Sequence, residues 1–324
     1  MRGAFNPAAC RFGEEVLLLL RVAEDVPAEE GRVSVPVVDF SGGTARPDVL
    51  SVRRDDPEVT LRDTRGLRYR GVEYLSTMSH LRVARSRDGV AFTVDETPFL
   101  LPEDPSERFG VEDARVTQIG GTYWINYTAV SADGWATALA STTDFASVER
   151  HGIIFPPANK DVSIFPGKTA AGRYAALHRP NNDLGKASVW YAESGDLRDW
   201  GGHRCILRPR EGVAWESAKI GGGGPCVETD AGWLQLYHAK DADSRYTLAL
   251  ALLDRDEPWR VLKRSTRPVF EPEEPFETDG FFGNVVFTNG WVQDGDRLLV
   301  YYGAADESVG VAETTVEELL ATLE

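Results

Sequence analysis

The sequence has few cysteines, no excess of positive charge and no long hydrophobic run, and each shortage excludes a class of protein. Its three cysteines, Cys10, Cys205 and Cys226, form no CxxC pair. An odd number gives no complete disulfide framework, which favours a reducing compartment. The formal net charge of −16 argues against nucleic acid or an anionic membrane surface as a partner. The longest apolar run, residues 16–20, is far too short to span a bilayer.

Signals for secretion, metal binding and covalent catalysis are also absent. Residues 1–7 lack the apolar core of a signal peptide, so we expect a cytoplasmic protein. The histidines are scattered without metal-ligand spacing, so we expect no metal and no cofactor. No Gly-x-Ser-x-Gly elbow or Cys–His pair indicates a nucleophile. The sequence leaves the oligomeric state open, homo-oligomers included.

What the sequence does contain is a series of short strand-like runs separated by Gly, Pro, Asp and Asn, which is typical of an all-β protein. A helical period is clear only at the end, over residues 315–323. Thr314 or Thr315 is the expected cap of that short C-terminal helix, with glutamates in its first turn.

An internal repeat indicates the architecture. Five times a strand ends in a small residue followed by a polar turn, at intervals of roughly 50–60 residues, the spacing of a propeller blade. The small residues are Ala84, Ala140, Ala192, Ala251 and Ala312. One such unit cannot bury both of its faces alone. We therefore predict a five-bladed β-propeller that forms a single catalytic domain over residues 1–324. A β-sandwich, the alternative, does not explain five copies of one module.

The first chemical candidate is the stretch 110–117, which contains Glu112, Asp113 and Arg115. Gly120-Gly121 follows as a hairpin signal, and the next strand is rich in aromatic residues. Two adjacent carboxylates and a guanidinium are equally compatible with a surface ion pair and with a catalytic acid held by a cation. The spacing alone does not decide between them.

Further polar residues stand near the strand ends of other units. They are Asn6, Arg21, His178, Arg179, Lys219, His238 and Asp306. Each has an ordinary interpretation as well. Arg21 fits the first solvated position after a buried strand, His178 fits a structural contact with a carboxylate, and the glycines after Lys219 fit a flexible turn rather than a P-loop. Because a propeller gathers such ends around one axis, one acid with several cations and aromatics predicts a pocket for a sugar and an oxyanion.

The motifs, taken together, resemble glycoside hydrolase family 130, the inverting β-mannoside phosphorylases and their hydrolytic relatives. They span almost the whole chain in the expected order. The matching stretches are 110–117, 177–180, 219–221, 237–238, 284–287 and 301–306. One departure is visible, because the family usually has Pro after the motif aspartate and this chain has Ala114.

The resemblance implies a five-bladed propeller and a role for each matched position. Asp113 would be the general acid, acting through the 3-hydroxyl of the mannosyl unit while inorganic phosphate, the co-substrate, attacks the anomeric carbon. Phosphate would be bound by Arg21, Arg179, Lys219 and His238. The sugars would be bound by Asn6, Arg115, His178 and Asp306. The expected product is α-mannose 1-phosphate, and the expected partners are a small oligosaccharide and phosphate.

Two other functions remain open. An inverting hydrolase needs a second carboxylate, about 6.5–9.5 Å from the first, to activate water, and Glu112, Glu216 and Glu228 are candidates for it. A carbohydrate-binding propeller without activity would keep the aromatics, although Asp113 and the cations argue against it. The acceptor sugar is not readable from the sequence. Residues 53–70 and 271–282, which include Phe281 and Phe282, are candidate lining loops.

Overall fold

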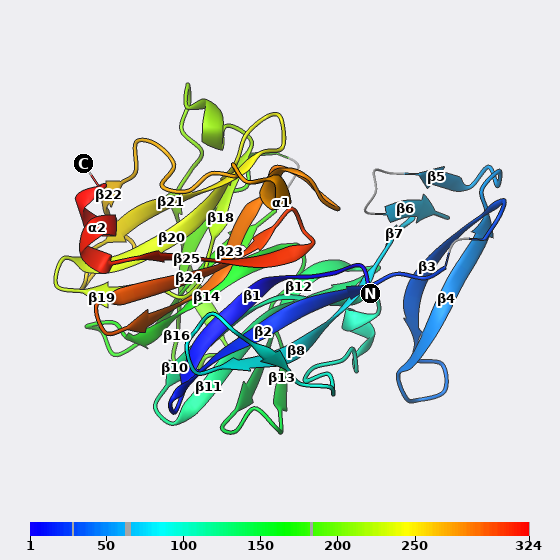
Figure 1. The fold of residues 1–324 in the computed structure, drawn as a ribbon, viewed down its shortest axis with the longest axis horizontal. Coiled ribbons are helices and arrows are strands. Elements are labelled where there is room, and N and C mark those ends of the chain that lie inside the picture. The colour runs from blue at the N-terminus through cyan, green and yellow to red at the C-terminus, as the bar shows by residue number, and fades with distance from the viewer. Residues whose placement is uncertain (28, 62–65, 182–183, 324) are drawn as a thin grey trace.

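The computed structural model describes residues 1–27, 29–61, 66–181 and 184–323, and these residues form an almost entirely β structure (Figure 1). Within them the only α-helices are the short α1 (Pro275–Thr278) and α2 (Val316–Ala321). Thr315 caps α2 in a reciprocal capping box with Glu318, as the sequence predicts. The predicted all-β class and the C-terminal helix are therefore confirmed. No helix in the described ranges has the length and apolar character needed to cross a membrane.

The strands follow one another in antiparallel meanders. The first meander consists of β1 (Gly3–Phe12), β2 (Glu15–Glu24), β8 (Met78–Ser86) and β9 (Thr93–Val94). The next consists of β10 (Gly110–Ile119), β11 (Thr122–Ser131), β12 (Gly134–Thr142) and β13 (Glu149–Phe155). A parallel bridge between Gly110 and Ser79 joins these two meanders into one sheet.

The remaining meanders form separate sheets. One contains β14 (Asn159–Lys168), β15 (Tyr174–Pro180), β16 (Val189–Ser194) and β17 (Trp200–Leu207). Another contains β18 (Lys219–Gly222), β19 (Val227–Thr229), β20 (Gly232–Lys240), β21 (Tyr246–Leu253) and β22 (Val261–Arg264). The last contains β23 (Val286–Asp294), β24 (Arg297–Ala304) and β25 (Ser308–Thr314).

The repeated small residues occupy the same place in every meander. They lie in β8, β12, β16, β21 and β25, each of which pairs with the central strand of its own meander. Three of the turns that follow share one hydrogen-bond pattern, in which a Ser or Thr hydroxyl accepts a backbone N–H three residues later. Ser86, Thr142 and Ser194 are these residues. The sequence repeat is therefore a structural repeat.

Apolar cores lie between neighbouring meanders. Leu139 and Ile154 of one meander pack with Val162 and Ile164 of the next. Another core combines leucines of β20 and β21 with β23, β24 and the C-terminal helix, including Leu319. Each meander therefore depends on its neighbour for burial, as expected for stacked repeats.

The first strand of several meanders is interrupted by a bulge, and this feature positions the site. The pairing of β1, β10 and β14 shifts register at Asn6, Asp113 and Asp161. These residues have left-handed φ values of 48°, 48° and 54°. Asn and Asp tolerate this conformation better than most residues, and a bulge re-aims the side chain of its residue.

The start of the chain packs against its end. Ala4 N donates to Glu307 O at 3.1 Å, and Asn289 Nδ2 donates to Asn6 O at 3.0 Å. Position 303 in β24 has room only for glycine, because a Cβ atom on Gly303 would lie 2.0 Å from Asn6 Oδ1. The first and last meanders are therefore neighbours.

A long excursion leaves the first meander between β2 and β8 and projects from the main body (Figure 1). It contains β3 (Arg32–Asp39), β4 (Arg46–Arg53), β5 (Val59–Leu61), β6 (Gly66–Tyr69) and β7 (Val72–Leu75). Its apolar side packs on Phe109 and Val130 of the main body. The repeat pattern contains no counterpart of this excursion, so the sequence analysis does not predict it.

Short helical turns carry a second repeated feature, a buried glutamate bound to a tyrosine of the central strand. Glu107 and Glu216 lie in 3₁₀ turns, Pro105–Glu107 and Ala214–Glu216, and Glu277 lies in α1. They accept hydrogen bonds from the hydroxyls of Tyr127, Tyr237 and Tyr302. Glu216 also binds Arg210 and Arg264 at 2.6 Å each.

Replacing Glu216 with alanine should destabilise the protein strongly. The change leaves Arg264 and Tyr237 without their buried acceptor, and breaking such a pair costs about 3–5 kcal/mol. Glu228→Ala is the matched control, because Glu228 pairs with Arg255 on the surface, where a salt bridge is worth about 0–1 kcal/mol. Urea unfolding measures both free energies. Equal losses for the two variants would contradict the structural role of Glu216.

Candidate active site

A cavity of about 800 Å³ collects most of the residues that the sequence analysis singled out. Most of its charged lining comes from the bulged strands β1, β10 and β14 and from β2, β15, β18 and β20, and Asp306 follows β24. The charged and polar residues that line it include Asn6, Arg21, Glu112, Asp113, Lys160, Asp161, Arg179, Lys219, His238 and Asp306. Two predicted site residues, Arg115 and His178, do not line it.

Asp113 is a buried carboxylate held on one oxygen. Its Oδ1 accepts from Asn6 Nδ2 at 3.0 Å and from Arg21 Nη1 at 3.0 Å. Arg21 Nη2 binds Glu112 at 2.7 Å, and its Nε binds Ser79. Within the described residues, Oδ2 of Asp113 accepts no hydrogen bond. The carboxylates of Glu112 and Asp113 therefore do not belong to a surface ion pair. Oδ2 of Asp113 remains available to a ligand.

Arg21 does not lie at the solvated end of its strand. β2 continues to Glu24, and the Arg21 side chain is 14% exposed. Burial acts to lower the pKa of Arg21, but the charges of Glu112, Asp113 and Asp306 outweigh it and raise that pKa. Two of its guanidinium nitrogens bind Asp113 and Glu112 and the third binds Ser79, so the side chain of Arg21 is held beside the two carboxylates.

Nearby positive charges favour the ionised form of Asp113. Burial acts to raise the pKa of Asp113, but the positive charges of Arg21, Lys160 and Arg115 outweigh it. With the hydrogen bond from Asn6, they hold that pKa below its ordinary value of 3.8. The surroundings of Asp113 therefore favour its charged form despite its burial.

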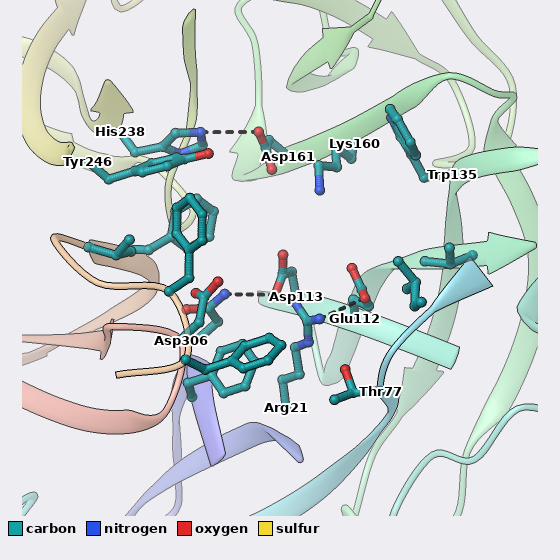
Figure 2. Close-up of a pocket in the computed structure, with 18 of the residues that line it drawn as sticks. Arg21, Thr77, Glu112, Asp113, Trp135, Lys160, Asp161, His238, Tyr246 and Asp306 are labelled. Atoms are coloured by element: carbon teal, nitrogen blue, oxygen red, sulfur yellow. Dashed lines mark hydrogen bonds and ion pairs between the residues drawn. The ribbon is translucent and has the colours of Figure 1, made fainter. Parts of the chain in front are cut away.

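A group of basic side chains also lines the cavity, and it consists of Lys160, Arg179, Lys219 and the neutral His238. It is called the cationic cluster after its two lysines and its arginine. Figure 2 shows Lys160 and His238 with Asp161 across an open space from Asp113, Glu112 and Arg21. Lys219 Nζ lies 5.0 Å from the ring centroid of Tyr246, and Lys160 Nζ lies 5.9 Å from that of Trp135. The cavity thus separates an acid from a group of cations.

Burial and neighbouring positive charges weaken the proton affinity of Lys219 and His238. Burial, with the charges of Arg179 and Lys160, holds the pKa of Lys219 well below its ordinary value. Burial lowers the pKa of His238 to about 4, although Asp161 works in the opposite direction. An anion bound among these groups would relieve the repulsion, so the cluster has the electrostatics of an anion site.

Asp161 is the anion that this cluster already contains. Arg179 Nε lies 2.5 Å and His238 Nε2 lies 3.3 Å from Asp161 Oδ2, and Arg115 Nη2 lies 3.4 Å from Oδ1. All four side chains are about 1% exposed. Sequence reasoning missed Asp161 and Lys160. The available signal was the resemblance of Lys160-Asp161-Val162 to the other bulged starts, Glu112-Asp113-Ala114 and Phe5-Asn6-Pro7.

Arg115 lies behind the cavity and connects strands. Its guanidinium donates to Asp113 O at 2.8 Å, Gly222 O at 3.1 Å and Gly223 O at 3.2 Å. The glycine run after Lys219 also packs closely against β14, because a Cβ on Gly221 would lie 2.4 Å from Asp161 Oδ2. Gly221 and Gly222 therefore belong to a strand packed against charged groups, and Gly223 and Gly224 follow that strand.

His178 packs beside the cavity lining. One ring nitrogen lies 3.0 Å from Asn159 Nδ2 and the other 3.1 Å from His203 Nδ1, and the ring stacks on Phe155. The carboxylate contact suggested by the sequence is replaced by an amide and a second imidazole. Burial, with the nearby His203, lowers the pKa of His178 to about 3. His178 is neutral and supports the strand that carries Arg179.

Aromatic side chains complete the cavity, and they include Phe5, Tyr74, Trp135, Tyr246, Phe281, Phe282 and Phe287. Phe281 and Phe282 thus line it, as the sequence suggested for 271–282. Of the other candidate loop, Gly66 lines the cavity, and residues 62–65 lie outside the described residues. Aromatic faces beside polar groups suit the alternating apolar and hydroxyl surfaces of a sugar.

Ala114 replaces the usual proline at a position where the change removes no pairing. Ala114 follows the bulge residue Asp113 and has no register partner in β11. Pro7 follows the bulge residue Asn6 and has no partner in β2. Both residues are buried. Alanine and proline both fit at this place in the bulge, because the residue there is not paired with the neighbouring strand.

No group of three or more histidine, cysteine or carboxylate side chains that could hold a metal occurs in the described part of the chain. Two of the three carboxylates considered for a hydrolytic base lie away from the cavity. Glu216 is buried in the contacts with Arg210 and Arg264, and Glu228 pairs with Arg255 at the surface. Glu112 does line the cavity, paired with Arg21.

Comparison with known proteins gives the same family by sequence and by structure. The model of glycoside hydrolase family 130, described as beta-1,4-mannooligosaccharide phosphorylase, matches residues 66–324. A beta-1,2-mannobiose phosphorylase from Listeria innocua is 45% identical over 99% of this chain and 91% of its own. A 1,2-beta-oligomannan phosphorylase from Thermoanaerobacter is 37% identical over 76% of this chain and 82% of its own. The solved Listeria innocua beta-1,2-mannobiose phosphorylase, complexed with beta-1,2-mannobiose, aligns with a TM-score of 0.95 over 99% of this chain and 92% of its own.

Removing the Arg21 charge should raise the pKa of Asp113. In Arg21→Gln the carboxylate loses its nearest cation while its burial, which also raises the pKa, stays. Carbon-13 NMR of labelled aspartate, titrated with pH, measures the change. Arg11→Gln, which removes a surface partner of Asp294, is the control and should leave the Asp113 titration in place. An Asp113 pKa that does not move in Arg21→Gln would contradict the electrostatic account.

Proposed function

The chain belongs to glycoside hydrolase family 130, as its motifs indicate, and on that premise we propose that it cleaves a β-mannoside with inorganic phosphate. The reaction inverts the anomeric centre and yields α-mannose 1-phosphate. The observation that supports it most directly is the separation of Asp113 from the cationic cluster across one cavity (Figure 2). β-1,2-Mannobiose is the substrate of choice to test, given the 45% identity to the Listeria innocua enzyme.

We propose that the meanders are the blades of a five-bladed propeller within a single domain over residues 1–324. Three observations support this arrangement. The bulged first strands of several meanders all contribute side chains to one cavity. The repeated alanines occupy equivalent strands. The first and last meanders are in contact, as closure of a ring requires.

Asp113 is the proposed general acid, and it must be protonated before it can act, although nearby positive charges favour its ionised form. Over a whole turnover, the proton that it gives to the leaving oxygen is balanced by the proton of hydrogen phosphate, because the sugar phosphate leaves as the dianion. Bound phosphate also adds negative charge, which raises the pKa of a nearby carboxyl. Phosphate thus supplies both the attacking oxygen and the conditions under which Asp113 is protonated.

The cationic cluster is the proposed phosphate site. Arg179 offers a planar guanidinium, which suits an oxyanion, and Lys219 and Lys160 add charge. His238 is neutral and can donate one N–H. Arg21 was expected to join them, but its contacts favour a different role, that of holding Asp113 and Glu112 in place.

The proposed mannose contacts lie around Asp113. Asn6 and Asp306 line the cavity beside it. Arg115 and His178, which the family resemblance also assigns to the sugar, lie behind the lining, and we propose that they support Asp113 and Arg179 from there. The three free cysteines support a reducing, cytoplasmic compartment, and the net charge of −16 argues against nucleic acid as a partner.

Phosphorolysis is favoured over hydrolysis because the cavity provides cations where a hydrolase provides a base. The hydrolytic route needs a free carboxylate opposite the acid. Asp161 lies there, but it is held by Arg179, His238 and Arg115. A carboxylate so strongly stabilised in its charged form is a weak base.

The test of the function is the product formed from β-1,2-mannobiose with and without phosphate. Cleavage that requires phosphate and releases α-mannose 1-phosphate is expected, and phosphorus-31 and proton NMR identify the ester and its anomer. Free mannose at equal rates in both tubes would indicate a hydrolase. If neither reaction proceeds, the protein is tested on a panel of β-1,4-mannosyl sugars. Cleavage of one of them indicates a different linkage specificity, and no cleavage indicates a binding protein without activity.

Asp113→Asn should lower kcat by about 10²–10⁴-fold, the usual loss when a general acid is removed. The amide keeps the shape of the side chain, so urea unfolding and circular dichroism should show a folded protein. Asp294→Asn, at a surface ion pair with Arg11, is the matched control and should retain full activity. Near-normal turnover by a folded Asp113→Asn protein would show that Asp113 is not the general acid.

A further inference from the structure

We propose that Asp161 is the positioning residue of this enzyme, the carboxylate that orients the phosphate-binding side chains and fixes them relative to the acid. This inference rests on the proposed phosphorolysis. Asp161 is not assigned to substrate contact by the family motifs in this sequence. Its place in the structure is nevertheless central, because it contacts residues of β10, β15 and β20 from its own strand β14.

The orientation of Arg179 depends directly on Asp161. Arg179 Nε binds Asp161 Oδ2, and Nη1 binds Asn181 Oδ1. No described residue accepts a hydrogen bond from Nη2, and Arg179 lines the cavity. Two guanidinium nitrogens are thus fixed by protein acceptors, while the N–H donors of Nη2 have no acceptor among the described residues, an arrangement that suits pre-organised oxyanion binding.

His238 and Arg115 extend the influence of Asp161 in two directions. His238 Nε2 lies 3.3 Å from Asp161 Oδ2, so the same oxygen contacts two members of the cationic cluster. Arg115 Nη2 lies 3.4 Å from Oδ1, and Arg115 Nη1 donates to Asp113 O at 2.8 Å. One carboxylate therefore connects the anion site with the backbone of the acid.

The charge balance explains why a carboxylate stands here. Burial opposes the ionisation of Asp161, but Arg179, His238 and Arg115 hold its pKa well below its ordinary value. It therefore stays charged and offsets part of the repulsion between Arg115 and Arg179, which are both buried. Without it, two buried guanidinium groups lose their counter-ion and the cationic cluster loses its fixed geometry.

The bulge and a neighbouring glycine determine where the carboxylate lies. Asp161 has a φ of 54°, so its side chain leaves the regular alternation of β14. Gly221 passes so close that an added Cβ would lie 2.4 Å from Asp161 Oδ2 and 2.5 Å from His238 Nε2. Its backbone is not in the left-handed region, so alanine fits the backbone conformation, and its nearest clashes are with the side chains of Asp161 and His238.

Two variants test the inference by different routes. Asp161→Asn removes the charge and keeps the shape, and Gly221→Ala keeps every charge and displaces the carboxylate together with His238. Each should raise the KM for phosphate by about 10- to 100-fold, the range for losing a hydrogen bond to a charged group, while the KM for mannobiose changes by less than about threefold. Arg179→Ala shows how far the KM for phosphate rises when the cation itself is removed. Gly121→Ala is the control, since nothing lies within 4 Å of its added Cβ.

The measurements are initial rates over both substrates and calorimetric binding of inorganic phosphate without sugar. A folded Asp161→Asn or Gly221→Ala protein with a phosphate KM near that of the wild type overturns the inference. Equal changes in both KM values also overturn it, because they indicate general damage. If Asp161→Asn does not fold, Gly221→Ala decides by comparison with His238→Gln, and a phosphate KM no higher than that of His238→Gln overturns the inference. A wild-type enzyme whose rate is independent of phosphate contradicts the proposed function itself, and this outcome is distinct from the others.

Discussion

The structure depends on burying charge at the meeting point of its strands. Asp161, Arg115 and Arg179 are nearly inaccessible to solvent and lie on three different strands. Taking such groups out of water is costly unless each finds its partners, so the strands must meet in one arrangement only. The same arrangement places Asp113 across the cavity from the cations (Figure 2). The packing requirement and the chemistry therefore select the same geometry.

The sequence predicted the features that repeat and those that belong to a motif. The alanines at regular intervals identified equivalent strands, and the motifs identified Asp113, Arg179, Lys219 and His238, all of which line one cavity. The capped helix at the C-terminus was equally predictable, because capping is a local interaction. These features share a property, since each is encoded in residues that are neighbours in the chain or recur at a fixed spacing.

The sequence could not predict what depends on contacts between distant strands. A bulge reverses the facing of a side chain without changing the residues, so Asp161 looked like an ordinary strand residue. Arg21 looked like the end of a strand, because its partners Glu112 and Asp113 lie about 90 positions away in the sequence. The excursion from β3 to β7 has no counterpart in the other meanders, so no repeat predicted it.

The contact between Asn6 and Gly303 links the packing of two distant strands to the cavity. Asn6 lies in β1, and its side-chain amide rests against Gly303 of β24, where an added Cβ would lie 2.0 Å from Asn6 Oδ1. The other end of the same amide donates a hydrogen bond to Asp113. Loosening of β24 against β1 therefore reaches Asp113 through a single amide, so the position of the proposed acid is coupled to the packing of a strand far from it in the sequence.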